Sequence, residues 1–285
     1  MAAGRCRPLF FVVALALVCG CDESKGRVRD PFYDEPMVNC YLYRLQFYDY
    51  SVEYSTYAEV FDNDGLRMVP IVVLNRDTLE PYYYTPTAYR YGHENPFPTN
   101  ARYDLNVTHY WGRAFSRVVM PGNFNMMLPP ERYILGLDST LVVSWQRSAA
   151  AQWYWLDIDL DYEFEDSLGV WDDFELSLDT ILTDTVVVIR PGRLFPAKLK
   201  IARLVEGDGA AMVWSGNGPA IEPGDAGNVR GDGFGFFNAI NEPREKYFYV
   251  GAPPLARRCP EARTVSARRL NRLRSRRVDS RSGRE

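Results

Sequence analysis

The stretch that decides the fold is Trp153–Phe164, which reads WYWLDIDLDYEF. Large apolar side chains and mostly acidic ones alternate along it from one residue to the next. A period of two is typical of a β-strand that has one face on a core and the other toward water. The stretch therefore predicts a long half-buried strand whose inner face carries Tyr154, Leu156, Ile158, Leu160 and Tyr162.

Segments of the same kind fill the chain on both sides of this stretch, and helical periodicity is almost absent. Strands spaced by 8–12 residues with turn signals between them are typical of β-sandwiches. The sequence thus predicts an all-β protein, with a long loop or an edge excursion over Tyr82–Asn100. The predicted strands are Val38–Tyr48, Ser51–Phe61, Met68–Leu74, Arg102–His109, Ala114–Met120, Thr140–Trp145, Trp153–Phe164, Trp171–Leu178, Thr183–Ile189, Leu199–Val205, Ala211–Trp214 and a pair around Asn241–Arg244.

Proline and glycine interrupt the strands over Pro121–Pro130, which is the best candidate for a domain boundary. Two sandwiches fit the length of the chain better than one large barrel. The prediction is therefore two tandem β-sandwiches, over residues 38–124 and 133–252.

Two motifs in the second half carry a family resemblance. Leu141–Trp145 followed by Tyr154–Ile158 resembles the B and C strands of fibronectin type III domains, and Leu194–Pro196 ahead of Leu199–Ile201 resembles their E–F corner. The match covers residues 139–205, about a quarter of the chain, and lacks the corner tyrosine of that family. The first half is more loosely immunoglobulin-like. The resemblance implies a spacer or a binding platform.

The N-terminus has the features of a secretory signal. Arg5 and Arg7 precede an apolar run, Leu9–Val18, that is too short to span a bilayer. The sequence LVCGC at Leu17–Cys21 resembles the lipobox of bacterial lipoproteins. The resemblance implies a signal peptide over residues 1–20, lipidation of Cys21, a tether over residues 21–37 and a lipid anchor in the cell envelope. An ordinary cleaved signal is the alternative, and the choice of inner or outer membrane stays open.

Charge is distributed unevenly along the chain. The last 31 residues carry 11 Arg and three acids, a net charge of +8, whereas residues 21–254 carry 20 basic and 34 acidic residues, a net charge of −14. An acidic body of this kind argues against nucleic acid as a partner. The composition of residues 255–285 predicts a disordered tail. This tail either binds anionic lipid, lipopolysaccharide or the acidic body, or is an extension without a function.

Four carboxylates, Asp157, Asp159, Asp161 and Glu163, follow one another at every second position. Hard cations such as Ca²⁺ bind clustered oxygen ligands, but neighbours on one face of a strand stand about 6.6–7 Å apart. We therefore interpret the ladder as a solvated face. Asp157, Asp159 and Asp161 remain weak candidates for metal ligands, and no metal or other cofactor is predicted.

Aromatic residues are the strongest indication of function, with 19 Tyr and 6 Trp in the chain. Their flat faces and polar tips suit sugar rings and protein hot spots, although β-propensity is an alternative reason for their number. The candidates are Trp153 and Trp155, which share a face with the acids, and Tyr82, Tyr83, Tyr84, Tyr89 and Tyr91 in the predicted loop.

Catalytic motifs are lacking, because the sequence contains neither a Gly-x-Ser-x-Gly elbow nor a His-Glu-x-x-His motif. We therefore expect a non-catalytic envelope lipoprotein that binds a glycan or a protein partner. The runner-up is a structural or assembly spacer within an envelope complex. A glycoside hydrolase is a minor alternative, since carboxylates are abundant.

Overall fold

The computed structural model describes residues 35–47, 51–62, 68–85, 87–93, 96–166, 168–196, 204–220 and 227–251. These residues form β-strands in three sheets and one short helix, α2 (Pro191–Leu194), which confirms the prediction of an all-β protein. The predicted signal peptide, the lipidation site Cys21, residues 21–34 of the tether and the tail all lie outside the described residues.

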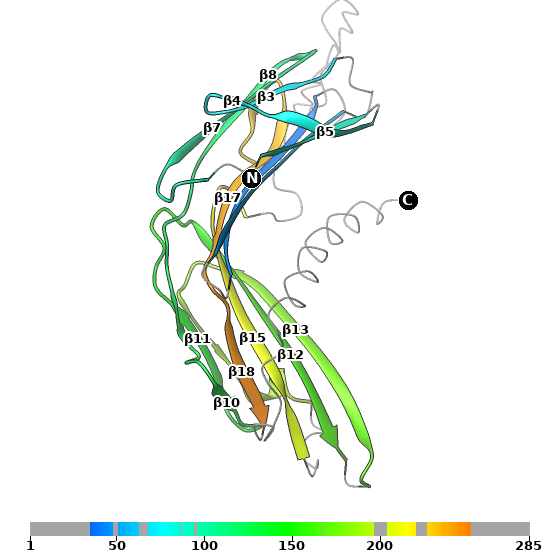
Figure 1. Ribbon diagram of the computed structural model, residues 1–285, viewed down its shortest axis with the longest axis vertical. Coiled ribbons are helices and arrows are strands. Elements are labelled where there is room, and N and C mark those ends of the chain that lie inside the picture. Colours follow the sequence, from blue (N-terminus) through cyan, green and yellow to red (C-terminus); the bar gives the residue numbers. More distant parts are fainter. Residues whose placement is uncertain are drawn as a thin grey trace, which may run out of the picture.

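One ten-stranded sheet runs along the length of the molecule (Figure 1). At its centre β15 pairs with β12 on one side and with β18 and then β17 on the other. The strand order is β10 (Tyr133–Leu135), β18 (Lys246–Gly251), β15 (Leu204–Asn217), β17 (Phe234–Glu242), β1 (Met37–Gln46), β2 (Val52–Phe61), β6 (Ala88–His93) and β5 (Glu80–Thr85), with β12 (Trp153–Glu165) beside β15 and β13 (Trp171–Leu182) beside β12.

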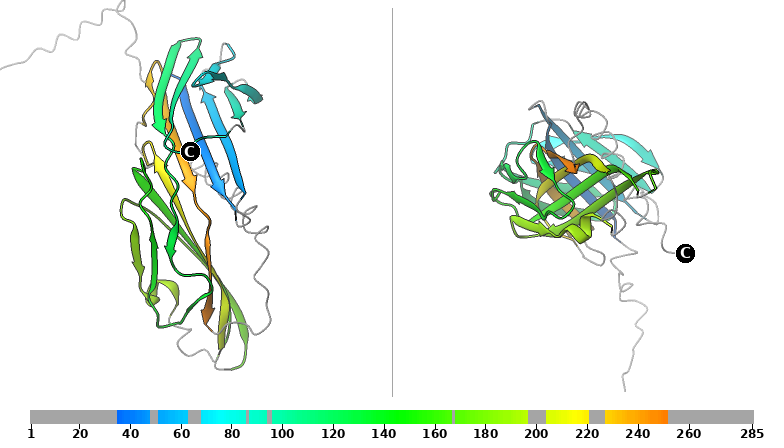
Figure 2. Two further views of the ribbon diagram at one scale, coloured as in Figure 1. Left: turned by 60° about the vertical axis from the view of Figure 1, so that its left-hand side comes forward. Right: turned by 90° about the horizontal axis from the view of Figure 1, so that it is seen from below.

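Two smaller sheets cover one face of this sheet, which we call the inner face, and the opposite face is the outer face. Figure 2 shows the two layers of the upper half, with β7 and β8 in green and β1 and β2 in blue. The five-stranded sheet has the order β16 (Arg230–Gly231), β8 (Gly112–Val119), β7 (Arg102–His109), β3 (Ile71–Leu74) and β4 (Asp77–Thr78); the three-stranded sheet has the order β14 (Val186–Ile189), β11 (Leu141–Trp145) and β9 (Met126–Leu128).

The lower core lies between the three-stranded sheet and β12, β15 and β18. The alternation predicted for β12 is confirmed, since its five inner residues from Tyr154 to Tyr162 are all buried. Burial raises the pKa of Tyr162 to about 12. At about 25 cal/mol per Å² of apolar surface, this face contributes much of the stability of the lower half.

The upper core lies between the five-stranded sheet and β1, β2 and β6. It also contains residues from a segment far along the sequence, 229–239. Val229, Phe237 and Ala239 are buried together with Val38 and Leu42. β17 runs parallel to β1, with Met37 opposite Phe234 at the start of the pairing. The two cores therefore do not follow the ranges 38–124 and 133–252, because β16 and β17 complete the upper core.

Two local predictions needed correction. Of the two interpretations of Tyr82–Asn100, the long loop was wrong and the edge excursion fits, because the segment contains most of β5 and all of β6. Pro81 is tolerated because β5 lies at the edge of the sheet. The sequence predicted a break between the strands Leu199–Val205 and Ala211–Trp214, but Leu204–Asn217 is one strand, β15. Residues 199–203 of the first predicted strand lie outside the described residues. The turn-like glycines of β15 have another role, since a Cβ at Gly209 would lie 2.4 Å from the ring of Phe248.

Within the described part of the chain, no helix has the length and apolar character needed to cross a membrane.

Candidate functional site

The predicted aromatic residues divide into exposed and buried groups. Tyr82, Tyr83 and Tyr84 are 62%, 47% and 71% exposed, and Trp155 is half-buried. Tyr91 was a candidate for ligand binding, but it lies in the upper core, where its hydroxyl donates to the carbonyl of Pro70 and burial raises its pKa. Its ring is therefore a structural element and is not presented to a ligand.

The register of β5 against β6 decides which tyrosines point outward. Tyr83 lies opposite Arg90, whose guanidinium stands 5.1 Å from the centre of the Tyr83 ring on the outer face. A bulge shifts the register at Tyr82, and its ring covers the outer side of Gly92, 3.4 Å from where a Cβ would stand. Tyr84 instead stacks on Tyr89 at 5.7 Å, and Tyr89 packs against the upper core.

The tryptophans of β12 lie on the same outer face. Trp155 pairs across the strands with Trp214 of β15, and their rings are 5.1 Å apart. Trp153, the other candidate, is only 7% exposed, because its ring lies across Gly216 and its Nε1–H donates to the carbonyl of Gly218 at 2.8 Å. Trp153 therefore packs within the molecule, which corrects its interpretation as an exposed ligand-binding side chain.

Tyrosines of β1 and β2 connect these two regions. Tyr41 stacks on Tyr43 at 6.1 Å and lies 6.5 Å from Tyr57, which is opposite it on β2. Sequence reasoning missed all three, although the spacing of Tyr41 and Tyr43 by two residues places both on one face of a strand. We name the resulting row of outer-face rings the aromatic strip; its members are Trp155, Trp214, Tyr43, Tyr41, Tyr57, Tyr82 and Tyr83. Trp214 and Tyr41 are only 5% and 6% exposed and pack in the same buried cluster as Trp153, so that the partly or fully exposed rings of the strip are the other five.

Polar groups accompany the aromatic strip at both ends. Arg90 pairs with Glu59 at 3.0 Å between Nε and Oε1. Burial alone lowers the pKa of Arg90, but this hydrogen bond and the adjacent negative groups outweigh it, so that the pKa is raised. At the other end the indole N–H of Trp214 donates to Glu242. The strip thus offers flat apolar faces with hydrogen-bonding groups beside them, a combination suited to carbohydrate rings.

An acidic array adjoins the strip on the lower outer face. Asp157, Asp159 and Asp161 are joined there by carboxylates of both neighbouring strands, which the sequence alone did not align. The cross-strand pairs are Asp157 with Asp179, Asp161 with Glu175 and Asp208, and Glu163 with Asp173 and Glu206. Among the described residues, no group of three or more His, Cys, Asp or Glu side chains has an arrangement that could hold a metal ion.

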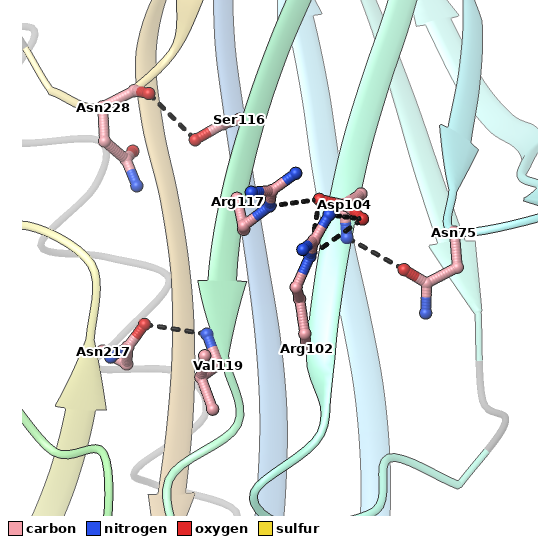
Figure 3. Close-up of polar contacts among 8 residues, drawn as sticks. All are labelled: Asn75, Arg102, Asp104, Ser116, Arg117, Val119, Asn217 and Asn228. Atoms are coloured by element: carbon pink, nitrogen blue, oxygen red, sulfur yellow. Dashed lines mark hydrogen bonds and ion pairs between the residues drawn. The ribbon is translucent and has the colours of Figure 1, made fainter.

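A polar cluster on the five-stranded sheet is built around Asp104 (Figure 3). Its carboxylate accepts from Arg102 at 2.9 Å and Arg117 at 2.6 Å, and the backbone N–H of Asp104 donates to Asn75 at 2.9 Å. These arginines hold the pKa of Asp104 below its usual value, despite its partial desolvation. The cluster lies beside a shallow hollow of about 290 Å³ lined by Asn75 and Phe97. Because arginines of β7 and β8 both bind this one carboxylate, we interpret the cluster as a clamp between neighbouring strands.

The same view shows hydrogen bonds that connect β8 to two later parts of the chain, at Asn217 and Asn228 (Figure 3). The hydroxyl of Ser116 donates to the carbonyl of Asn228 at 2.9 Å. The backbone N–H of Val119 donates to the side chain of Asn217, the last residue of β15, at 2.8 Å. Asn217 also donates to the carbonyl of Ala150 at 2.7 Å, so that one amide links both halves of the molecule.

Comparison with known proteins gives no family for the chain. No protein-family model matches it, and no curated protein matches its sequence. The interpretation of the site therefore depends on its geometry.

Proposed function

We propose that the protein is a cell-envelope lipoprotein of non-catalytic binding type, and that the aromatic strip is its binding surface for a glycan. The observation that carries the proposal is that rings from β12, β15, β1, β2 and β5 share one face of one sheet. Sheet propensity alone explains aromatic residues in strands but not this gathering on one face, where Trp155, Tyr43 and Tyr57 are half-buried and Tyr82 and Tyr83 are exposed. A protein partner is the alternative occupant.

The fold proposal is that the lower half is a fibronectin type III-like sandwich and the upper half an immunoglobulin-like one. The strand orders β9-β11-β14 and β13-β12-β15-β18 support it, because they correspond to the A-B-E and C′-C-F-G sheets of that architecture. β17 enters the upper sheet between β15 and β1, so the two sandwiches we propose share one sheet.

Anchoring in the membrane is part of the same proposal. It is supported by the lipobox-like LVCGC at Leu17–Cys21, and it would hold the body in the cell envelope, on the periplasmic side or facing outward. A Cys21→Ala variant is expected to lose partitioning into the detergent phase of a Triton X-114 extract. Partitioning that survives the substitution would contradict a lipid anchor at Cys21.

Binding is tested with the purified full-length chain in detergent, with Trp fluorescence as the readout. The panel contains neutral oligosaccharides from cellulose, xylan, mannan and dextran, and the anionic polysaccharides hyaluronate and alginate. We expect saturable quenching by one class, weakened by Trp155→Ala and Tyr83→Ala. The control is Tyr84→Ala, which removes an equally large exposed ring on the opposite side of β5. No response to any member would reject glycan binding.

A spacer role is the second candidate, favoured by a specific observation. The ten-stranded sheet continues through both halves, and Tyr41, Trp153, Met212, Trp214 and Ile240 form a third buried cluster across their junction. Such a junction resists bending, as a spacer requires. Cross-linking the anchored protein in its native membrane distinguishes the two roles, because a spacer gives stable protein adducts whether or not a glycan is added.

A further inference from the structure

The side of the five-stranded sheet that faces away from the upper core carries an excess of arginine. Its solvent-facing positions include Arg113 and Arg117 of β8, Arg102 of β7 and Arg230 of β16, all of them exposed, and one carboxylate, Asp104. We call this surface the basic face. Four arginines and one aspartate give it a net charge of +3, whereas the body of the protein, without its two terminal segments, carries −14. A positive surface on an acidic body indicates an anionic partner.

Most of this charge is not neutralised within the molecule. The two arginines that share Asp104 keep one net positive charge between them (Figure 3). Arg230 donates to two backbone carbonyls at 3.2 Å, and no carboxylate of the described residues pairs with the guanidinium of Arg230 or of Arg113. Asp232, at the rim of the face, accepts the backbone N–H of Arg113 at 3.1 Å. Because a guanidinium stays protonated when it bonds to carbonyls, the basic face attracts anions.

Exposed apolar side chains lie among the arginines. Phe115 is 52% exposed and stands between Arg113 and Arg117 on β8, opposite Arg230 on β16. Ile71, on the same side of β3, is 49% exposed. This mixture suits the interface of a bilayer, where cations meet anionic headgroups and apolar side chains enter between them.

The described chain begins beside the basic face. Pro36 and Ala114 of β8 lie on either side of Gly233, where a Cβ would stand 3.1 Å from the Pro36 carbonyl oxygen and 2.9 Å from Cβ of Ala114. Fifteen residues lead back from Pro36 to Cys21, and they reach at most about 50 Å. A lipid anchor at Cys21 therefore holds the basic face within reach of the bilayer, at a high effective concentration.

The aromatic strip and the acidic array lie on the other side of the molecule. Both belong to the outer face of the long sheet, whereas the basic face is the solvent side of a sheet that covers the inner face (Figure 1). Contact between the basic face and a bilayer thus leaves the exposed rings of the strip turned toward the solution. It also keeps the carboxylates of the array away from anionic headgroups.

We propose that the basic face is a membrane-docking surface, which lies on the anionic headgroups of the same bilayer that holds the lipid anchor, with Phe115 at headgroup level. This proposal rests on the proposed anchor at Cys21 and adds the orientation of the body to it. Each arginine near an anionic leaflet strengthens such binding roughly fivefold. The anchor keeps the protein on the membrane, and the basic face decides which side of the body meets it.

The test follows a dye on the basic face of the full-length, lipidated protein in vesicles. Phe115→Cys carries the environment-sensitive dye NBD; Cys259→Ser removes a second thiol, and Cys40 is buried. The vesicles consist of phosphatidylcholine, alone or with about one third phosphatidylglycerol. We expect about twofold brighter NBD emission in the anionic vesicles, because the dye enters the interface. The gain should vanish in 0.5 M NaCl, where the Debye length falls to about 4 Å.

Charge variants show whether the arginines of the basic face cause the signal. Arg113→Gln combined with Arg230→Gln is expected to lower the ratio of docked to undocked protein roughly fivefold for each arginine. The matched control is Arg147→Gln with Arg190→Gln, which removes two exposed arginines from the lower half and should leave the signal unchanged. Every variant retains residues 255–285, so that any affinity of this segment for anionic lipid is the same throughout.

Two further label positions complete the design. Ile181→Cys places the dye on an exposed position of the outer face of β13, where the emission should be the same in both kinds of vesicle. Ile71→Cys places it on the basic face at a second strand, and it decides the question if Phe115→Cys fails to fold.

Flotation of the vesicles separates this proposal from the anchor on which it rests. Wild-type protein that does not float with neutral vesicles would reject the anchor and the proposal together. Protein that floats with both kinds of vesicle, while the dye at position 115 or 71 does not respond to anionic lipid, would overturn the proposal and leave the anchor intact. An unchanged signal in the Arg113→Gln, Arg230→Gln variant would overturn it too. So would a response to soluble alginate or hyaluronate but not to anionic lipid, because the basic face would then bind an anionic glycan.

Discussion

His109 is the one buried imidazole among the residues whose side chains the structure describes, and it is only 4% exposed at the end of β7. Its Nδ1 accepts the backbone N–H of Trp111 at 3.3 Å, while the indole N–H of Trp111 donates to Asp62. The carboxylate of Asp232 lies nearby and accepts the backbone N–H of Arg113 at 3.1 Å. Burial lowers the pKa of His109, and the charges of Asp232 and Asp62 oppose this only in part.

This shift predicts a pH dependence of stability. Between the lowered pKa of folded His109 and its ordinary value of 6.5, the unfolded chain binds a proton that the folded chain does not. The free energy of unfolding therefore falls as the pH drops below about 6.5, and it is restored above it. A His109→Gln variant keeps an acceptor for Trp111 and is expected to show a flatter profile in urea unfolding between pH 7 and pH 5.

The reference for this experiment is Asp104, whose lowered pKa affects stability in a different range. A carboxyl group whose pKa is lowered in the folded protein stabilises the fold fully at pH values above its ordinary pKa of 3.8. This contribution is lost only as the pH falls below that value. Asp104→Asn is thus expected to leave the slope between pH 7 and pH 5 unchanged. Parallel profiles for the wild type and His109→Gln would show that His109 does not cause the slope.

At the scale of the element, β12 and β15 show how closely two strands are packed at the junction. The ring of Trp153 lies over Gly216, its partner on β15, and a Cβ there would stand 2.0 Å from Cζ2 of the indole. Gly216→Ala is therefore expected to destabilise the protein by about 1–3 kcal/mol, the usual cost of overpacking a filled core. The midpoint of urea unfolding measures the loss.

Gly192 provides the matched control, because nothing lies within 4 Å of the position where its Cβ would stand. Gly192 lies in α2, where alanine is favoured over glycine, so Gly192→Ala is expected to leave stability unchanged or raise it by up to about 1 kcal/mol. If Gly216→Ala were equally harmless, Trp153 would have to move freely. In that case Trp153 would regain its place as a candidate ligand-binding side chain.

Strands whose residues alternate could be predicted from the sequence, and β12 is the clearest of them. β15 could not, since Gly207 and Gly209 read as a turn, and only the neighbouring strand and Phe248 explain them. The aromatic strip could be predicted only at its ends, at Trp155 and at Tyr82 and Tyr83. The middle of the strip depends on how β1 pairs with β2 and β17. The register of strands that are far apart in the sequence cannot be predicted from local residue patterns.

At the scale of the whole molecule, β17 connects two parts that the proline-rich stretch at Pro121–Pro130 had seemed to separate. β17 pairs with the end of β15 and then with β1, along nine residue pairs. It places Phe237 and Ala239 in the upper core. The chain thus returns to its first half after completing most of its second. The upper core is therefore incomplete without residues near the C-terminal end of the described part, and loss of a buried phenylalanine alone costs about 3–5 kcal/mol.

This connection predicts that the fragment 35–130 does not fold alone. It lacks Val229, Phe237 and Ala239, and the loss of their packing and of the parallel pairing with β1 is comparable to the lower part of the 5–15 kcal/mol that typically stabilises a domain. Joining residues 227–243 to the C-terminal end of the fragment through a flexible linker is expected to restore a cooperative thermal transition. It is followed by circular dichroism and by the fluorescence of Trp111, the single tryptophan in either molecule. The same fusion with Phe237→Asp serves as the control and should remain unfolded. A cooperative transition in 35–130 itself would mean that the upper half folds without β17, and the range 38–124 would then stand as an independent domain.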